Sequence, residues 1–223
     1  MSIRFTVIKK FEELAAHYNA SPFGGKEWLE NYNVTPNTMV PVLVDEPEGR
    51  ELRLMQWGLI PFWAKDRKIG NAMINARADE AQDKPGFRDS FKDKRCIIPA
   101  TGFYEWQKLT SVKLPYYVTP KAGLFSFAGL WSRWISPESV EVETFSIITT
   151  TANDVVKPVS DRMPVCLPSS GWSPWLAKGT RPNDLQELLR PLPGEQLGIV
   201  PVSKYVNALK SSGPKCIAPI DGH

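Results

Sequence analysis

Histidine is scarce in this 223-residue chain, which holds only His17 and His223. Because neither lies near the polar motifs described below, a Ser–His or Cys–His dyad of the usual kind is not expected. Cysteine is also rare: Cys96, Cys166 and Cys216 are widely spaced and have apolar neighbours. This pattern argues against a disulfide framework or a Cys-x-x-Cys metal site. We therefore expect buried free thiols and a reducing, cytoplasmic location.

Long apolar runs and cofactor-binding motifs are missing as well. No apolar run approaches the roughly 20 residues of a membrane span, so no membrane partner is expected. The sequence has no P-loop, dinucleotide fingerprint, zinc motif or GxSxG elbow, so we expect no cofactor and no metal. The net charge of +3 is mildly basic. Clustering matters more than total charge for nucleic-acid binding, so this value decides nothing by itself.

The sequence does contain many segments that resemble strands. β-Branched and aromatic residues, which favour strands, are frequent through its middle. Residues 10–19 instead show apolar positions at helical spacing, and two further helices are indicated around Trp172 and after Pro182. Ser169 or Ser170 is a candidate cap for the first of these, and a short helix is a candidate after Asn153. The expected strands are 39–44, 52–60, 95–106, 114–120, 124–134, 143–152 and 197–203.

These strands and helices neither alternate strictly nor segregate cleanly. With 42% hydrophobic and 23% charged residues, the composition is that of an ordinary globular protein. We predict one α+β domain spanning residues 1–223, with a curved, mixed or barrel-like sheet and peripheral helices. Strands 95–106 and 114–120 are expected to form a hairpin.

Glu105 is the first candidate for chemistry because aromatic residues surround it in Gly-Phe-Tyr-Glu-Trp, residues 102–106. Aromatic packing removes water from a carboxylate and favours its protonated form. A carboxyl group held near neutrality is suited to general acid or base catalysis. The alternative is a strand residue that faces outward beside core aromatics.

Two short polar motifs are further candidates. In Asn75-Ala-Arg77, the amide can donate and accept hydrogen bonds, and the guanidinium offers a fork for phosphate. Asp161-Arg162 combines an acid and a guanidinium ahead of a rigid Met-Pro turn. A helix cap and a structural salt bridge are the alternatives. The aromatic residues Trp57, Phe62 and Trp63 could stack an unpaired base or belong to the core.

Taken together and in order, these segments resemble the SOS-response-associated peptidase family, whose members shield abasic sites in single-stranded DNA. Each segment alone is a weak signal, but the ordered set covers nearly the full length of the chain. The matching stretches are residues 4–5, 32–36, 57–63, 74–77, 95–106, 127–131, 148–153 and 161–165, with a looser match at 201–203.

The resemblance implies specific roles. Typical members begin Met-Cys-Gly-Arg, and removal of the methionine exposes a cysteine that reacts with the ring-opened abasic aldehyde. Its amine forms an imine, and its thiol closes a thiazolidine ring, which crosslinks protein to DNA. The family's catalytic asparagine and glutamate match Asn75 and Glu105, and Arg4, Arg77 and Arg162 are implied to contact DNA. Peptidase activity in this family is self-cleavage of the initiator methionine, not general proteolysis.

This chain departs from the family pattern at three positions. Ser2 stands in place of the cysteine, Ile3 in place of a glycine, and Ser160 in place of a histidine. A hydroxyl is a poorer nucleophile than a thiol, and serine cannot carry protons near pH 7 as imidazole does. We therefore expect covalent capture to be impaired while the DNA cleft is retained, with Trp63 as an additional base-stacking residue.

The resulting hypothesis is a single-stranded DNA-binding protein specific for abasic sites, monomeric and cytoplasmic, and associated with the nucleoid when bound to DNA. Whether it is an enzyme is left open. One alternative is hydrolase or lyase chemistry by Glu105 and Asn75 on the same scaffold. The other is an interaction module with no role in DNA binding.

Overall fold

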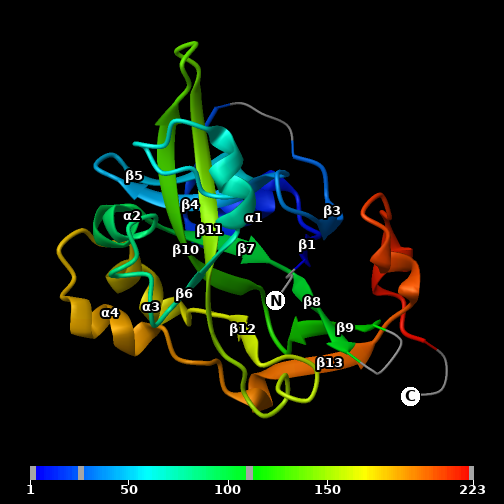
Figure 1. Cartoon of the computed structure of the whole chain (residues 1–223). Helices are drawn as coiled ribbons and strands as arrows, with labels where there is room; N and C mark the ends of the chain where they lie inside the picture. Colours follow the sequence, from blue (N-terminus) through cyan, green and yellow to red (C-terminus); the bar gives the residue numbers. More distant parts are fainter. Residues whose placement is uncertain (1–3, 25–27, 109–112, 221–223) are drawn as a thin grey trace.

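The computed structural model describes residues 4–24, 28–108 and 113–220. It is a strand-rich α+β structure with short helices at its periphery (Figure 1). The helices are α1 (Phe11–Tyr18), α2 (Arg88–Asp93), α3 (Ser169–Leu176) and α4 (Pro182–Leu188), and the 3₁₀ helices are η1 (Arg67–Ala72), η2 (Gly194–Gln196), η3 (Lys204–Asn207) and η4 (Pro214–Ile217). The strands are β1 (Arg4–Val7), β2 (Ser21–Pro22), β3 (Asn31–Val34), β4 (Met39–Glu46), β5 (Gly49–Trp57), β6 (Asn75–Arg77), β7 (Arg95–Ala100), β8 (Gly102–Lys108), β9 (Lys113–Pro120), β10 (Phe125–Ile135), β11 (Glu141–Thr151), β12 (Arg162–Pro164) and β13 (Leu197–Pro201).

A closed barrel forms the centre of the fold. Its strands follow the order β11-β10-β7-β4-β5, and these neighbours pair antiparallel. The barrel closes where β5 pairs with β11 in parallel, with Phe145 opposite Trp57. β10 and β11 continue beyond the barrel as a long hairpin (Figure 1). The mixed, barrel-like α+β architecture expected from the sequence is confirmed.

A second sheet, in the order β13-β9-β8-β1-β3, packs beside the barrel. The expectation of one strand over 95–106 is wrong, because β7 belongs to the barrel and β8 to the second sheet. At the crossing, the backbone N–H of Thr101 donates to the carbonyl of Thr6. Gly102 suits this crossing, since a Cβ there would lie 2.4 Å from the Tyr117 ring. The expected β8–β9 hairpin is confirmed, with Tyr104 opposite Tyr117.

Aromatic side chains fill the core between the sheets. Phe5, Trp57, Phe103 and Phe127 are almost fully buried, and the rings of Phe5 and Trp57 lie 5.1 Å apart, edge to face. Trp57 is therefore a core residue rather than a base-stacking one. Its indole N–H donates to the carbonyl of Ile74 at 2.8 Å, which fixes the chain just before Asn75.

The peripheral helices largely follow their sequence patterns. α1 buries the face predicted from its apolar spacing, and α4 begins at Pro182 as expected. α3 starts at Ser169, but its cap position is Pro168 and no side chain caps it. The residues after Asn153 form successive turns instead of the expected short helix. None of the helices in the described ranges has the length and apolar character needed to cross a membrane.

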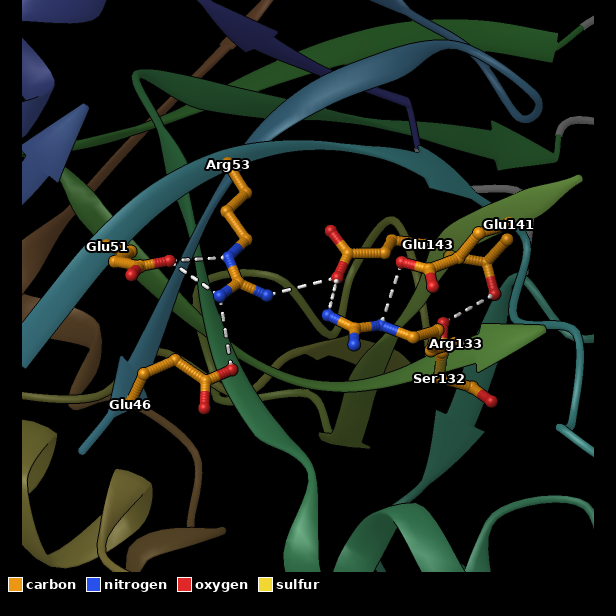
Figure 2. A network of polar contacts seen from close by, with 8 residues as sticks. Glu46, Glu51, Arg53, Ser132, Arg133, Glu141 and Glu143 are labelled. Carbon is orange, nitrogen blue, oxygen red and sulfur yellow. Dashed lines mark hydrogen bonds and ion pairs between the residues drawn. The ribbon is translucent and has the colours of Figure 1, made fainter. Parts of the chain in front are cut away.

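A network of ion pairs joins four barrel strands (Figure 2). The nearly buried guanidinium of Arg53 on β5 pairs with Glu51 on the same strand, Glu46 on β4 and Glu143 on β11. Glu143 also pairs with Arg133 on β10. Because several carboxylates share each guanidinium, the network compensates charges that would be costly to bury alone.

Candidate functional site

A pocket of about 660 Å³ opens between the second sheet and the segment before β12. Strand β8 contributes Glu105, Trp106 and Gln107, and residues 157–162 form the facing wall, while Lys113 at the start of β9 completes the lining. The Gln107 side chain crosses between the two walls and donates to the carbonyl of Pro158 at 3.2 Å. The pocket therefore joins two of the motifs picked out from the sequence, those around Glu105 and Arg162.

Glu105 is the buried acid of this pocket, with 4% of its surface exposed. Its strand position opposite Tyr116, between aromatic neighbours, removes water from the carboxyl group. Burial raises the pKa of Glu105 to about 8. At pH 7 the carboxyl group is mostly protonated and is suited to give and take back a proton.

Asn75 lies on the short strand β6, which pairs in parallel with β11. Ala76 faces the core, so Asn75 and Arg77 project from the opposite face of the strand. Within the described residues, Asn75 Oδ1 and Glu105 Oε1 are both buried and lack a hydrogen-bond partner. Buried polar atoms in folded proteins are nearly always paired, so these two oxygens mark positions that a ligand could complete.

Arg77 and Arg162 converge on a shared carboxylate. Strand β11 pairs with the strands of both arginines: Thr149 lies opposite Arg77 of β6, and Thr151 lies opposite Arg162 of β12. Asp79 pairs with Arg77 at 2.8 Å and with Arg162 at 3.6 Å. Half of the Arg77 side chain is exposed, and burial together with the nearby Arg77 charge lowers the pKa of Arg162. The pair presents two guanidinium groups beside the pocket, an arrangement suited to phosphate.

The Ser160 hydroxyl is engaged with the backbone of Arg162. Its hydroxyl donates to the carbonyl of Arg162 at 2.9 Å and accepts from the Arg162 N–H at 3.4 Å. These bonds close a tight turn that leads into β12, where the Arg162 guanidinium donates to Thr149 Oγ1 at 3.3 Å and to the Thr149 carbonyl at 2.6 Å. Ser2 and Ile3, the other two positions at which the sequence departs from the expected family pattern, lie outside the described residues.

Arg4 holds the C-terminal segment against the second sheet. Its guanidinium donates to the carbonyls of Val206 at 2.6 Å and Asn207 at 3.4 Å, and lies 4.4 Å above the Trp106 ring. The Trp106 indole N–H in turn donates to Asn207 Oδ1 at 2.7 Å. The C-terminal segment thus fixes one wall of the pocket, and no local sequence pattern revealed this role of Asn207.

The aromatic turn after β5 divides into buried and exposed members. Phe62 is 61% exposed and Trp63 is 49% exposed, in contrast to Trp57. The carbonyl of Ala64 accepts from the Trp134 indole at 2.7 Å, which anchors the turn to the β10–β11 hairpin. Two large rings are therefore held at the surface on a fixed turn.

The three thiols have no place in this pocket. Cys96, Cys166 and Cys216 are free and buried, as expected from the sequence. Burial raises the pKa of each thiol. Among the described residues, no group of three or more histidine, cysteine, aspartate or glutamate side chains could hold a metal ion.

Comparison with known proteins assigns this architecture to a family. The family model of the SOS response associated peptidase (SRAP) matches residues 1–209. The chain belongs to the SRAP family. A relative, the abasic site processing protein YoqW of Bacillus subtilis (strain 168), is 40% identical over an alignment of 218 residues that covers 96% of this chain and 97% of that protein. The abasic site processing protein HMCES of Xenopus tropicalis is 31% identical and aligns with 88% of this chain and 71% of its own length.

A solved structure shares the fold of this chain. A crystal structure of a protein from Bacteroides thetaiotaomicron superposes with a TM-score of 0.89 at 28% identity, covering 97% of this chain and 99% of that one. The family predicted from the ordered sequence motifs is therefore confirmed.

Proposed function

We propose that this SRAP protein binds single-stranded DNA at abasic sites through the pocket that contains Glu105. The observation that carries the proposal is the convergence of Arg77 and Arg162 beside a buried, protonated carboxyl group. The family assignment supports it, since the relatives from Bacillus subtilis and Xenopus tropicalis are named abasic site processing proteins.

Each part of the site has a role in this proposal. Arg77 and Arg162 bind phosphates on either side of the lesion, since a guanidinium fork matches phosphate oxygens. Trp63 stacks an unpaired base, because aromatic faces bind bases of any sequence. In this proposal the Asn75 amide orients the aldehyde of the open sugar and the Glu105 carboxyl group transfers protons. Arg4 acts at the site indirectly, by holding Trp106.

In this proposal the protein forms little permanent thiazolidine crosslink to DNA. Ser2 supplies a hydroxyl where a thiol is needed to close a five-membered ring, and a hydroxyl is the poorer nucleophile. The Ser160 hydroxyl is committed to the Arg162 carbonyl in the turn before β12. We expect binding to be retained and a heat-stable adduct to be scarce.

The test compares the affinity for a fluorescent single-stranded oligonucleotide containing one abasic site with that for the intact oligonucleotide. Arg77→Ala is the key variant because this side chain is half exposed and pairs only with Asp79 and Glu80 among the described residues. Its loss should weaken binding about tenfold and reduce the salt slope by about one. Arg88→Ala, on the surface of α2, is the matched control for charge. Equal affinities for Arg77→Ala and the natural protein would contradict the proposal.

A lyase is the second candidate function. Two features favour it: the Asn75 and Glu105 oxygens that have no hydrogen-bond partner in the described part of the chain, and the raised pKa of Glu105. An acid that gives and regains protons near neutral pH suits addition to an aldehyde followed by elimination. Cleavage of an abasic oligonucleotide, lost in Glu105→Gln while binding is retained, would identify this activity.

A further inference from the structure

The pocket holds two primary amines, those of Lys113 and Lys157. An aldehyde condenses with a primary amine to form an imine, and the other lining side chains offer no such amine: they are carboxyl, amide, indole, guanidinium, hydroxyl or aliphatic groups. The Ser160 hydroxyl donates to a backbone carbonyl. The chain's three thiols are buried away from the pocket. The lysines are therefore the nucleophiles that the described part of the pocket can offer an aldehyde.

Lys157 sits on the better-fixed wall. Asn153 holds this segment, because its side-chain oxygen accepts from the N–H groups of Val155 and Val156 at 3.1 and 3.0 Å. The Lys157 N–H donates to the carbonyl of Asn153 at 2.9 Å, and the next carbonyl, that of Pro158, accepts from Gln107. Lys113, by contrast, is the first residue of β9 and borders residues 109–112, which the structure does not describe.

The Lys157 wall is also continuous with the DNA-binding motif. Residues 157 to 162 line the pocket without a break and end at Arg162. A flexible four-carbon stem on a fixed backbone allows the ammonium or amine group to sweep the pocket mouth. A phosphate bound at Arg162 would hold the neighbouring sugar next to this stretch of chain, which raises the effective concentration of the aldehyde at the amine.

We propose that Lys157 supplies a primary amine that condenses reversibly with the ring-opened abasic aldehyde in this pocket. This inference rests on the proposed binding of abasic DNA. It adds a nucleophile from the body of the protein, distinct from the N-terminal residue.

Formation of the imine releases one molecule of water. The unprotonated nitrogen of Lys157 attacks C1′ of the aldehyde, and the N–C bond forms as the C=O π-bond opens. The oxygen takes a proton from the Glu105 carboxyl group, and the nitrogen returns one, so Glu105 is restored. A second proton from Glu105 then allows the hydroxyl to leave as water, the nitrogen returns its remaining proton to the Glu105 carboxylate, and the C=N bond remains. No thiol lies in the described lining to close a ring on this imine, so water can reverse it.

The experiment traps the imine with sodium borohydride, which reduces C=N to a stable secondary amine. The protein is incubated with single-stranded DNA bearing one abasic site, reduced, digested and mapped by mass spectrometry. The adduct is expected on Lys157. Lys157→Arg keeps the positive charge but cannot be trapped, so adduct yield should fall at least tenfold with affinity unchanged within twofold. Lys121→Arg, on an exposed turn outside this pocket, should trap like the natural protein.

The outcomes separate this inference from the proposed function. Tight binding with the adduct on the N-terminal amine or on Lys113, or with no adduct, would overturn the role of Lys157 and leave the binding proposal intact. Undiminished trapping by Lys157→Arg would do the same. No binding by the natural protein would overturn both. A loss of affinity in Lys157→Arg beyond twofold would identify a phosphate contact in place of a nucleophile.

Discussion

Glu105→Gln should make the protein more stable at high pH, although it removes a polar group from the site. Glutamine has nearly the same shape but carries no charge at any pH. In the natural protein, burial raises the pKa of Glu105 from its usual 4.5 to about 8. Folding therefore opposes ionisation of this one carboxyl group, and the free energy of unfolding must depend on pH.

The sign and size of this pH dependence follow from the pKa of Glu105 in the unfolded chain and in the native protein. Below about pH 4.5 the carboxyl group is protonated in both the native and the unfolded state, so it contributes no pH dependence. Between pH 4.5 and 8 the unfolded chain loses this proton first, and stability falls as the pH rises. Above pH 8 the loss is complete and amounts to about 5 kcal/mol.

Urea unfolding at pH 5, 7 and 9 measures this effect. The stability difference between Glu105→Gln and the natural protein should move in favour of the variant by several kcal/mol from pH 5 to pH 9. Glu48→Gln, in the exposed β4–β5 turn, is the control for removal of a carboxylate. If the difference for Glu105→Gln changes by less than about 1 kcal/mol over this range, the carboxyl group ionises without a burial penalty. Its assignment as a proton donor at neutral pH would then be wrong.

Two further predictions concern the crosslinking chemistry and the barrel. Ser2→Cys with Ile3→Gly and Ser160→His should restore a stable adduct on abasic single-stranded DNA, measured over time on denaturing gels. A triple variant that folds and binds DNA but forms no more adduct than the natural protein would show that the pocket has diverged further. Arg53→Met should destabilise the barrel by about 3 kcal/mol, since it leaves Glu46 and Glu51 without their guanidinium partner while Glu143 keeps Arg133. Urea unfolding measures this loss. A loss below about 1 kcal/mol would mean that water screens the ion pairs and that they contribute little to the free energy of unfolding.

Local sequence patterns determined most of the secondary structure. The apolar spacing in residues 11–18 was sufficient to predict α1, because a helix buries one stripe of side chains. Runs of β-branched and aromatic residues located β4, β5, β10 and β11 in the same way. The pattern failed at residues 95–106, since the apolar character continues unbroken while the chain passes from the barrel to the second sheet. A change of partner strand leaves little trace in local composition.

The ordered motifs also determined the family and named the candidate site residues. They identified Asn75, Glu105, Arg77 and Arg162 because each residue type suits a step in binding or proton transfer. The motifs could not place these side chains relative to one another. That placement comes from β11, which pairs with β6 on one side and β12 on the other and so brings Arg77 and Arg162 to Asp79.

Only the tertiary structure decided what surrounds each group. The closure of β5 on β11 joins residues about 90 positions apart, and the contact between Arg4 and Val206 spans 202 positions. The environment of Glu105 likewise depends on the segment around Ser160, far along the chain. Burial and electrostatic shifts depend on distance in space, and a local sequence pattern carries no information about which distant segment supplies the neighbours. The sequence alone therefore determined which chemical groups are present, and the fold decided which of them are buried, paired or available to react.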